Sequence, residues 1–513
     1  MIVSKFFVVA ILVISQFSCV LANDISVAYN NISKSLDPYE QLTHETLRTT
    51  TMVFDSLVRT SKTGGFDPAL AIKWKVIDEN KTRFYLNKSV YFHSGKKLNV
   101  DDIIFTYQRI KKAPEFKSIF LPIKDVKAID DYTFDIISKR SFPLVLNLAA
   151  LFFPMDSEFY SGKTTDGKNK NEVVIGAKSF AAFNTSGTGA FTVKEFSKDK
   201  ITFLKSKSYW KKTKTNVETI TVEKVDDESA RVDGLLAGKF SIINPVGISG
   251  ITRIRDSEKY KIVNLPGESL LTFLINFERS AGLKDINIRL AINHAINKEL
   301  IIEKTMKDLA TPAEQFSPPV YSGHNTFLKP GYDPKKSLQL IKEANFKGPL
   351  VFDMIAPDYR DERISHMIVE MLKAVGIQIN LKILPENDYW GVVDKSGADL
   401  MMVGWFSDTK DSNNFFEYLA ACPVKKTIMG KFNSGKYCNP EVDQLIKEAN
   451  VIMKPPKRAD VLKKIEQKLH SEAMHLPLFW ENVVWAAEPN IQLEDSITGL
   501  DVPYYEELIV SEK

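Results

Sequence analysis

The order of the expected strands and helices changes at Ser269, and this change constrains the fold more than any other feature. Before it, segments that are rich in Phe and Tyr alternate between apolar and polar residues. This pattern predicts antiparallel strands within residues 80–93, 125–138 and 191–205, after a first strand at residues 25–29. After Ser269, apolar strands alternate with helices of 3.6-residue period, which is typical of an α/β domain.

Local signals place several elements more closely. Asp101 is expected to cap a helix over residues 102–111, and the pair Asp333-Pro334 supplies an N-cap and a first-turn proline for another helix. Gly376 is expected to end the helix before it. The second half then predicts strands at residues 270–277, 350–355, 377–384 and 399–405, with helices at residues 288–296 and 364–375.

The length of the chain, 513 residues, exceeds what one hydrophobic core usually serves, so two or three domains are expected. No stretch rich in Pro or Ser separates them, which favours a chain that crosses between domains more than once. Residues 476–487 return to a strand-like composition close to the C-terminus. If this strand and the strand at residues 270–277 both run between lobes, they form a two-strand hinge.

The N-terminus has the pattern of a secretory signal, in which Lys5 precedes the apolar run of residues 6–14. That run is too short to span a bilayer, which takes about 20 apolar residues. Cleavage after Ala22 is the favoured prediction, and a lipoprotein site at Cys19 is the alternative, although the polar Gln16 stands where such a signal usually has an aliphatic residue.

Charge and cysteine content limit the partners. Without the signal segment, 67 basic and 64 acidic residues give a net charge of +3 with no basic patch, so nucleic acid is not an expected partner. The two remaining cysteines, Cys422 and Cys438, lie close together in a chain directed to an oxidising compartment. A disulfide is the favoured interpretation, two free buried thiols are the alternative, and a zinc site is less favoured because no His/Cys pair surrounds them at ligand spacing.

Catalytic motifs give no support to an enzyme. The chain has no phosphate-binding loop, Ser249 misses the nucleophile-elbow pattern by one position, and the seven His residues are dispersed. We therefore expect neither catalysis, nor a cofactor, nor a bound metal.

An ordered set of motifs covers residues 35–478. It opens with Leu36-Asp37-Pro38 and continues with residues 68–74 and Phe92-His93-Ser94-Gly95, in which Ser94 stands where Asp is usual. Further motifs lie at residues 187–191, 209–210, 226–238, 289–296, 404–408 and 437–443. The set resembles the family 5 extracellular solute-binding proteins, which serve dipeptide, oligopeptide and nickel importers of the ABC type.

The resemblance implies a two-lobed periplasmic-binding-protein fold of the α/β class with three domains. Residues 1–22 would be the signal peptide, and domain I would combine residues 23–56, 184–268 and 483–513. Domain II would be an insertion at residues 57–183, and domain III an α/β lobe at residues 269–482. The family also places a Cys pair at the positions of Cys422 and Cys438.

The resemblance implies that the chain is a monomeric periplasmic protein that encloses a short peptide between its lobes. It would deliver the peptide to a membrane permease, which a cytoplasmic ATPase powers. Capture of a nickel chelate or haem on the same fold is one alternative. A periplasmic chaperone or sensor that uses the cleft without transport is another.

Two loops supply the candidate contacts for the charged ends of a peptide. Asp408 follows the strand at residues 399–405, and Arg360 follows the strand at residues 350–355, so parallel strands would bring both to one carboxyl edge. The resemblance assigns Asp408 to the ammonium group of the peptide. Arg360, or Arg363 three residues on, would bind the carboxylate.

Two backbone segments are expected to pair with the peptide as added strands: the loop of Asn30, Asn31 and Ile32, and the main chain from Gly404 to Phe406. Trp405 and Phe406 would either line side-chain pockets or pack in the core.

Overall fold

The computed structural model describes residues 23–61, 64–329 and 331–512. The predicted signal segment, with cleavage after Ala22 or an acylated Cys19, lies outside these residues. Within the part of the chain that is described, no helix combines the length and the apolar character needed to cross a membrane.

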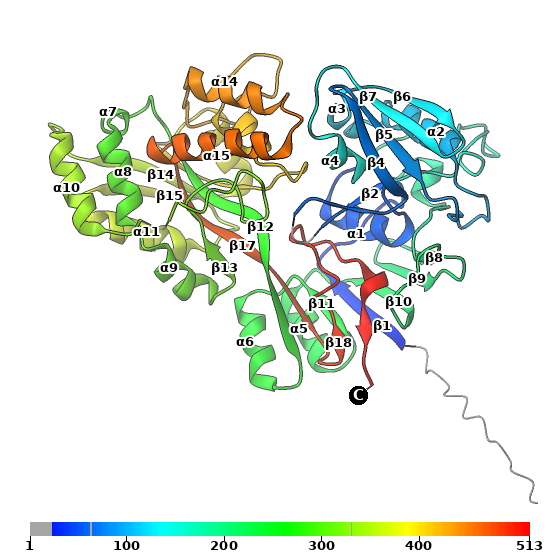
Figure 1. Ribbon diagram of the computed structural model, residues 1–513. Helices are drawn as coiled ribbons and strands as arrows, with labels where there is room; N and C mark the ends of the chain where they lie inside the picture. Colours follow the sequence, from blue (N-terminus) through cyan, green and yellow to red (C-terminus); the bar gives the residue numbers. More distant parts are fainter. Residues whose placement is uncertain (1–22, 62–63, 330, 513) are drawn as a thin grey trace, which may run out of the picture.

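One mixed sheet of eleven strands runs through the whole molecule (Figure 1). Ten of its strands follow the order β15-β14-β16-β12-β17-β11-β1-β10-β9-β8, and β13 pairs with β17 beside this path. The strands are β1 (Asn23–Tyr29), β8 (Phe191–Phe196), β9 (Lys200–Lys205), β10 (Val217–Lys224), β11 (Ile242–Asn244), β12 (Lys261–Ile275), β13 (Ala310–Pro312), β14 (Val351–Pro357), β15 (Gln378–Leu384), β16 (Leu400–Trp405) and β17 (His475–Ala487).

Two lobes share this sheet. We call residues 23–260 with residues 488–512 the first lobe, and residues 276–474 the second lobe; β12 and β17 connect them (Figure 1). The first lobe contains α1 (His44–Val53), α2 (Val100–Ile110), α3 (Phe116–Ile119), α4 (Val145–Ala149), α5 (Glu228–Leu236) and α6 (Ile248–Ser257). The second lobe contains α8 (Ile286–Ala295), α10 (Pro334–Ala344), α11 (Glu362–Ala374), α12 (Glu386–Asp394), α14 (Pro440–Ala449) and α15 (Pro455–Ser471).

The second lobe confirms the predicted alternation of strands and helices. β14 lies parallel to both β15 and β16, as expected for neighbouring strands of an α/β sheet. Asp333 caps α10 through the backbone N–H of Lys336, and Gly376, with φ of 82°, follows the end of α11.

Strand β12 is buried on both faces where it runs through the second lobe. Along β12, Leu271 and Phe273 belong to one hydrophobic cluster, whereas Leu270 and Leu274 belong to the cluster on the opposite face. Because successive side chains of a strand point to opposite faces, a sheet covered on both sides produces the nearly continuous apolar run seen in the sequence.

A second, four-stranded antiparallel sheet in the first lobe has the order β4-β5-β7-β6. Its strands are β4 (Ala71–Asp78), β5 (Lys81–Leu86), β6 (Ile123–Asp130) and β7 (Thr133–Ser138). The antiparallel strand predicted within residues 80–93 is β5, which begins after the tight turn at residues 79–80. The predicted extent to residue 93 was wrong, because β5 ends at Leu86.

The predicted cap of α2 was also wrong by two residues. Asn99, not Asp101, caps the helix: its side chain accepts a hydrogen bond from the backbone N–H of Asp101, while the Asp102 carboxylate accepts one from the backbone N–H of Asn99. This reciprocal capping box fixes the start of the helix at Val100.

The connecting strands confirm that two strands run between the lobes. β12 and β17 pair with each other in antiparallel orientation, while β12 also pairs with β16 and β17 also pairs with β11. The register of the β12–β17 pair shifts between Leu265 and Ser269. The domain boundaries predicted at residues 268/269 and 482/483 fall inside these two strands, and the division into three domains remains a prediction.

Candidate ligand-binding site

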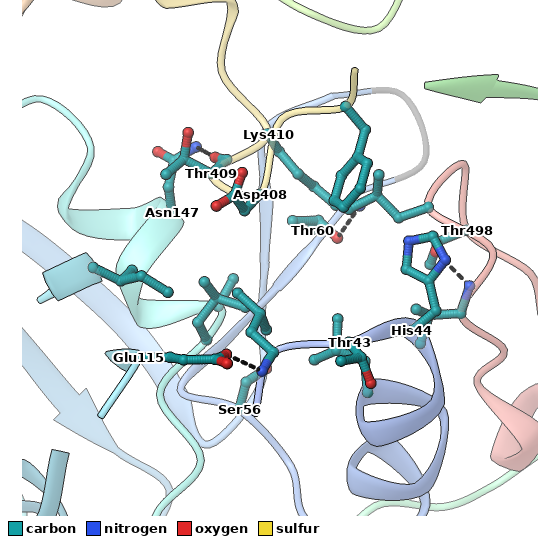
Figure 2. Close-up of a pocket in the computed structure, with 18 of the residues that line it drawn as sticks. Thr43, His44, Ser56, Thr60, Glu115, Asn147, Asp408, Thr409, Lys410 and Thr498 are labelled. Carbon is teal, nitrogen blue, oxygen red and sulfur yellow. Dashed lines mark hydrogen bonds between the residues drawn. The ribbon is translucent and has the colours of Figure 1, made fainter. Parts of the chain in front are cut away.

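A cavity of about 700 Å³ lies between the two lobes. Its walls come from segments far apart in the sequence: residues 42–60, 114–153 and 498–504 of the first lobe, and residues 404–432 of the second. In Figure 2, Asp408, Thr409 and Lys410 lie on one side of the space, and Thr43 and Ser56 on the other. This volume is within the range of about 300–1,000 Å³ that is typical of small-molecule sites.

Asp408 is a partly buried carboxylate in the wall of this cavity that lacks a counter-ion among the described residues. It lies in the turn after β16 and is partly buried. Its Oδ1 accepts one long hydrogen bond of 3.5 Å from Asn414 Nδ2, and it forms no ion pair with any residue that the structure describes. Burial raises the pKa of the Asp408 carboxyl above its ordinary value. A carboxylate in this condition gains from a cationic ligand group.

Asn414 links Asp408 to the aromatic wall of the cavity. Its Oδ1 accepts a hydrogen bond of 2.9 Å from the indole Nε1 of Trp405. The Trp405 ring lies 5.2 Å from the ring of Phe432 and 5.5 Å from that of Tyr418, measured between centroids. Trp405 therefore does both things expected of it: it packs within an aromatic cluster and lines the cavity.

Phe406 faces the first lobe. Its side chain is 41% exposed, and its ring lies 5.3 Å from the ring of His44 at the start of α1. His44 Nε2 is buried without a hydrogen-bond partner among the described residues, and burial lowers the pKa of this histidine. The pair forms a second, largely apolar part of the cavity wall.

One edge of β16 remains open beside the cavity. β12 covers the other edge as far as Trp405, whereas β14 pairs with β16 only at Leu400 and Met401. The backbone of residues 402–405 on that edge thus has no strand partner among the described residues. An extended ligand can add there as a further strand.

The two predicted arginines differ in their positions. Arg360 lies behind Gly404, where a Cβ added to the glycine would be 2.9 Å from Arg360 Nη2, and it forms an ion pair with Glu481 of β17. Arg363 is 59% exposed at the start of α11 and is paired with Asp361. Arg360 therefore adjoins the cavity wall, whereas the structure does not bring Arg363 to it.

The loop of Asn30, Asn31 and Ile32 lies elsewhere. Asn31 and Ile32 line a separate small cavity with Arg48, on a different face of α1 from the one that carries His44 and Leu47. The cavity between the lobes is lined instead by Leu42, Thr43 and His44, which sequence reasoning missed. Thr43 is the N-cap of α1, and its helix-start signal was the clue available in the sequence.

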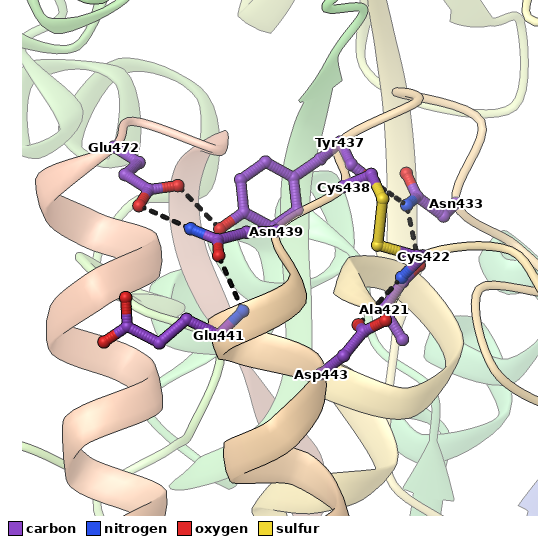
Figure 3. The surroundings of a disulfide bond; sticks show 9 residues. All are labelled: Ala421, Cys422, Asn433, Tyr437, Cys438, Asn439, Glu441, Asp443 and Glu472. Carbon is purple, nitrogen blue, oxygen red and sulfur yellow. Dashed lines mark hydrogen bonds between the residues drawn. A yellow bond between two sulfur atoms is a disulfide. The ribbon is translucent and has the colours of Figure 1, made fainter.

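A disulfide between Cys422 and Cys438 confirms the predicted pairing (Figure 3). The loop that it closes contains Phe432 of the cavity wall. Within the loop, Asn433 Nδ2 donates hydrogen bonds of 2.9 and 2.6 Å to the carbonyl oxygens of Ala421 and Tyr437. The disulfide and these bonds together hold the loop against the cavity.

No group of three or more His, Cys, Asp or Glu side chains within residues 23–61, 64–329 and 331–512 is arranged to hold a metal ion. The arrangement present in the cavity, an unpaired carboxylate beside an open strand edge and aromatic rings, is suited to binding.

Residues 65–427 match the sequence profile of the bacterial extracellular solute-binding proteins, family 5 Middle. The chain belongs to this family. Family 5 proteins are substrate-binding proteins rather than enzymes.

Among its relatives, this family 5 protein is 27% identical to the dipeptide-binding protein of Escherichia coli over 438 residues, which cover 79% of each chain. It is 25% identical to heme-binding protein A of Haemophilus influenzae over 457 residues, covering 83% of this chain and 81% of the relative. The structure of DppA from Helicobacter pylori in complex with the peptide STSA has a TM-score of 0.73 and 21% identity, with 96% of this chain and 98% of that chain covered. These comparisons support the predicted two-lobed α/β fold.

Proposed function

We propose that this family 5 protein captures short peptides between its lobes and delivers them to the membrane permease of an ABC importer. The observation that carries the proposal is the partly buried, unpaired carboxylate of Asp408 in the cavity between the lobes. The dipeptide-binding relative and the peptide complex of DppA support the choice of peptide over other solutes.

The geometry suggests how a peptide lies in the cavity. Its ammonium group binds Asp408, and its backbone follows the open edge of β16 from Gly404 to Phe406. Its side chains contact Trp405 and Phe406. Its carboxylate binds Arg360, which must then share its guanidinium with Glu481. Arg363 and the loop of residues 30–32 have no place in this arrangement, because both lie away from the cavity.

The remaining features of the proposal follow from the sequence. The protein is a non-catalytic monomer that needs no cofactor and binds no nucleic acid. It is exported to the periplasm with its signal peptide removed after Ala22. The intact mass of the secreted protein tests this processing, because a lipid on Cys19 gives a heavier species that starts at residue 19.

Calorimetry with a matched pair of ligands tests the role of Asp408. Wild-type protein is titrated with Ala-Ala and with N-acetyl-Ala-Ala, which lacks the ammonium group. A charge-assisted hydrogen bond contributes about 1.5–3 kcal/mol, so we expect both acetylation and Asp408→Asn to weaken binding at least about tenfold. Acetylation should have little further effect in Asp408→Asn.

Asp460→Asn is the control for this experiment, because Asp460 is an exposed acid of α15 outside the cavity. Equal affinity of wild type and Asp408→Asn for Ala-Ala would contradict the assignment. Because a relative is named as heme-binding, the same preparation is titrated with haem, and binding of haem but not of peptide would replace the peptide proposal. Transport is tested by deleting the gene and measuring peptide uptake; normal uptake would favour a chaperone or sensor.

A further inference from the structure

A second cavity of about 670 Å³ adjoins the first within the cleft between the lobes. The two cavities share four lining residues: Thr60, Asn147, Lys410 and Thr498. Because these residues line both spaces, they form the partition between them.

Lys410 is the part of this partition that crosses from one lobe to the other. It belongs to the turn after β16 in the second lobe, and its Nζ lies 3.3 Å from Thr60 Oγ1 in the first lobe (Figure 2). The same Nζ lies 3.8 Å from the Glu268 carboxylate on connecting strand β12. Both contacts are long, so the lysine side chain is held loosely and can move aside. When the Lys410 side chain moves aside, Glu268 keeps the hydrogen bond of 2.7 Å that it accepts from the Tyr321 hydroxyl.

The two cavities have similarly apolar walls and differ in their charged groups. Apolar residues in the wall of the second cavity include Leu144, Leu146, Pro266, Pro319, Ile452 and Met453.

Every charged side chain that the structure describes in that wall has a partner of opposite charge. Arg458 binds Asp411 through two hydrogen bonds of 2.6 and 2.8 Å, and Glu494 binds Lys261 at 2.8 Å. Glu268 and Lys410 form the remaining pair. The first cavity offers the unpaired carboxylate of Asp408, whereas the described residues of the second offer no unpaired charge to a ligand. A charged ligand group entering the second cavity would lose its hydration without gaining a counter-ion.

We propose that the second cavity is a further ligand compartment, which takes the uncharged, apolar residues of peptides too long for the first cavity, and that Lys410 is the gate between the two. The inference rests on the proposed peptide-binding function and deepens it. With Lys410 in place, the first cavity accepts short peptides; with the side chain displaced, a longer chain continues past Thr60 into the second.

Calorimetry with three peptides tests the gate. The probes are Ala-Ala and the C-terminally amidated peptides Ala-Ala-Leu-Leu and Ala-Ala-Glu-Glu, so that neither longer peptide brings a terminal carboxylate into the second cavity. They are titrated into wild type, Lys410→Ala and Lys410→Arg. Lys410→Ala should bind Ala-Ala-Leu-Leu at least about tenfold more tightly than wild type does, because burial of an apolar side chain supplies that much. Ala-Ala and Ala-Ala-Glu-Glu should show no such gain. Lys410→Arg keeps the charge and the length of the gate, so its preferences should match wild type.

A second substitution tests the compartment itself. Leu144 lines only the second of the two cavities, and Leu144→Trp reduces the space there. In the double variant Lys410→Ala/Leu144→Trp, the gain for Ala-Ala-Leu-Leu should disappear while the affinity for Ala-Ala is retained.

The outcomes separate this inference from the proposed function. If wild type binds Ala-Ala but Lys410→Ala gains nothing for the longer apolar peptide, or if the gain survives Leu144→Trp, the second compartment is refuted and peptide binding stands. If neither wild type nor the variants, all with intact melting transitions, bind any of the three peptides, peptide binding is refuted and the compartment with it.

Discussion

Removal of the Cys422–Cys438 disulfide should make the loop in one wall of the cavity open more easily. The length of the loop that the disulfide closes determines how much stability is lost. The cysteines are 16 positions apart, and a closed loop of about 15 residues stabilises by roughly 3 kcal/mol in the chain-entropy model. The double variant Cys422→Ser/Cys438→Ser keeps the hydrogen bonds of Asn433 and the packing of Phe432 on Trp405. We therefore expect a folded protein whose loop opens more often.

Hydrogen–deuterium exchange resolved by mass spectrometry measures this opening. A loss of about 3 kcal/mol corresponds to roughly a hundredfold faster exchange of protected amides. The increase should be confined to residues 416–443, and the distant strands β4 to β7 serve as the internal control. Addition of reductant to the wild type should reproduce the effect. Unchanged exchange in residues 416–443, or an equal increase over the whole chain, would refute the reasoning.

Three further predictions concern the connecting strands, the cavity carboxylate and the C-terminal segment. Gly267→Ala should lower the free energy of unfolding by about 1–3 kcal/mol in calorimetric melting, because the added Cβ would lie 1.9 Å from the carbonyl oxygen of Glu481. Gly391→Ala on α12 is the control: its added Cβ meets nothing within 4 Å, so this variant should be neutral or stabilising. As the pH falls through the raised pKa of Asp408, titration at several pH values should show weaker peptide binding. Protonation relieves the burial of the charge, so the ligand-free wild type should simultaneously gain stability relative to Asp408→Asn. Arg48→Ala should cost about 1.5–3 kcal/mol in denaturant unfolding and weaken peptide binding, because it leaves the partly buried Asp501 without its cation within residues 498–504, a segment of the cavity wall; equal unfolding midpoints would contradict this.

The second lobe was predictable because its signals are local. A helix such as α11 carries its apolar face and its terminal Gly376 within one stretch of sequence, and the buried strand β16 is a short apolar run. The same locality placed Asp408 directly after a strand, at the edge where the cavity lies.

The connecting strands and the first-lobe wall of the cavity could not be predicted, because they depend on contacts between residues far apart in the sequence. β12 begins at Lys261, although Pro266 and Gly267 are residues typical of a turn, because β17 pairs with both ends of the strand and the register shift accommodates the break. The first-lobe wall of the cavity joins the start of α1 to residues 498–504, more than 440 positions later in the chain. No local pattern connects these segments, and the loop of residues 30–32 was chosen in their place.

The position of β17 in the sheet also bears on how the protein is made. This strand pairs with β12 along one edge and with β11 and β13 along the other. It begins at His475, far along the chain from β12, which ends at Ile275. During synthesis, β11 and β12 each present an unpaired edge until β17 emerges. Folding domain by domain from the N-terminus, which is common in large proteins, therefore cannot complete the central sheet. That sheet can form only after residues 475–487 have been synthesised.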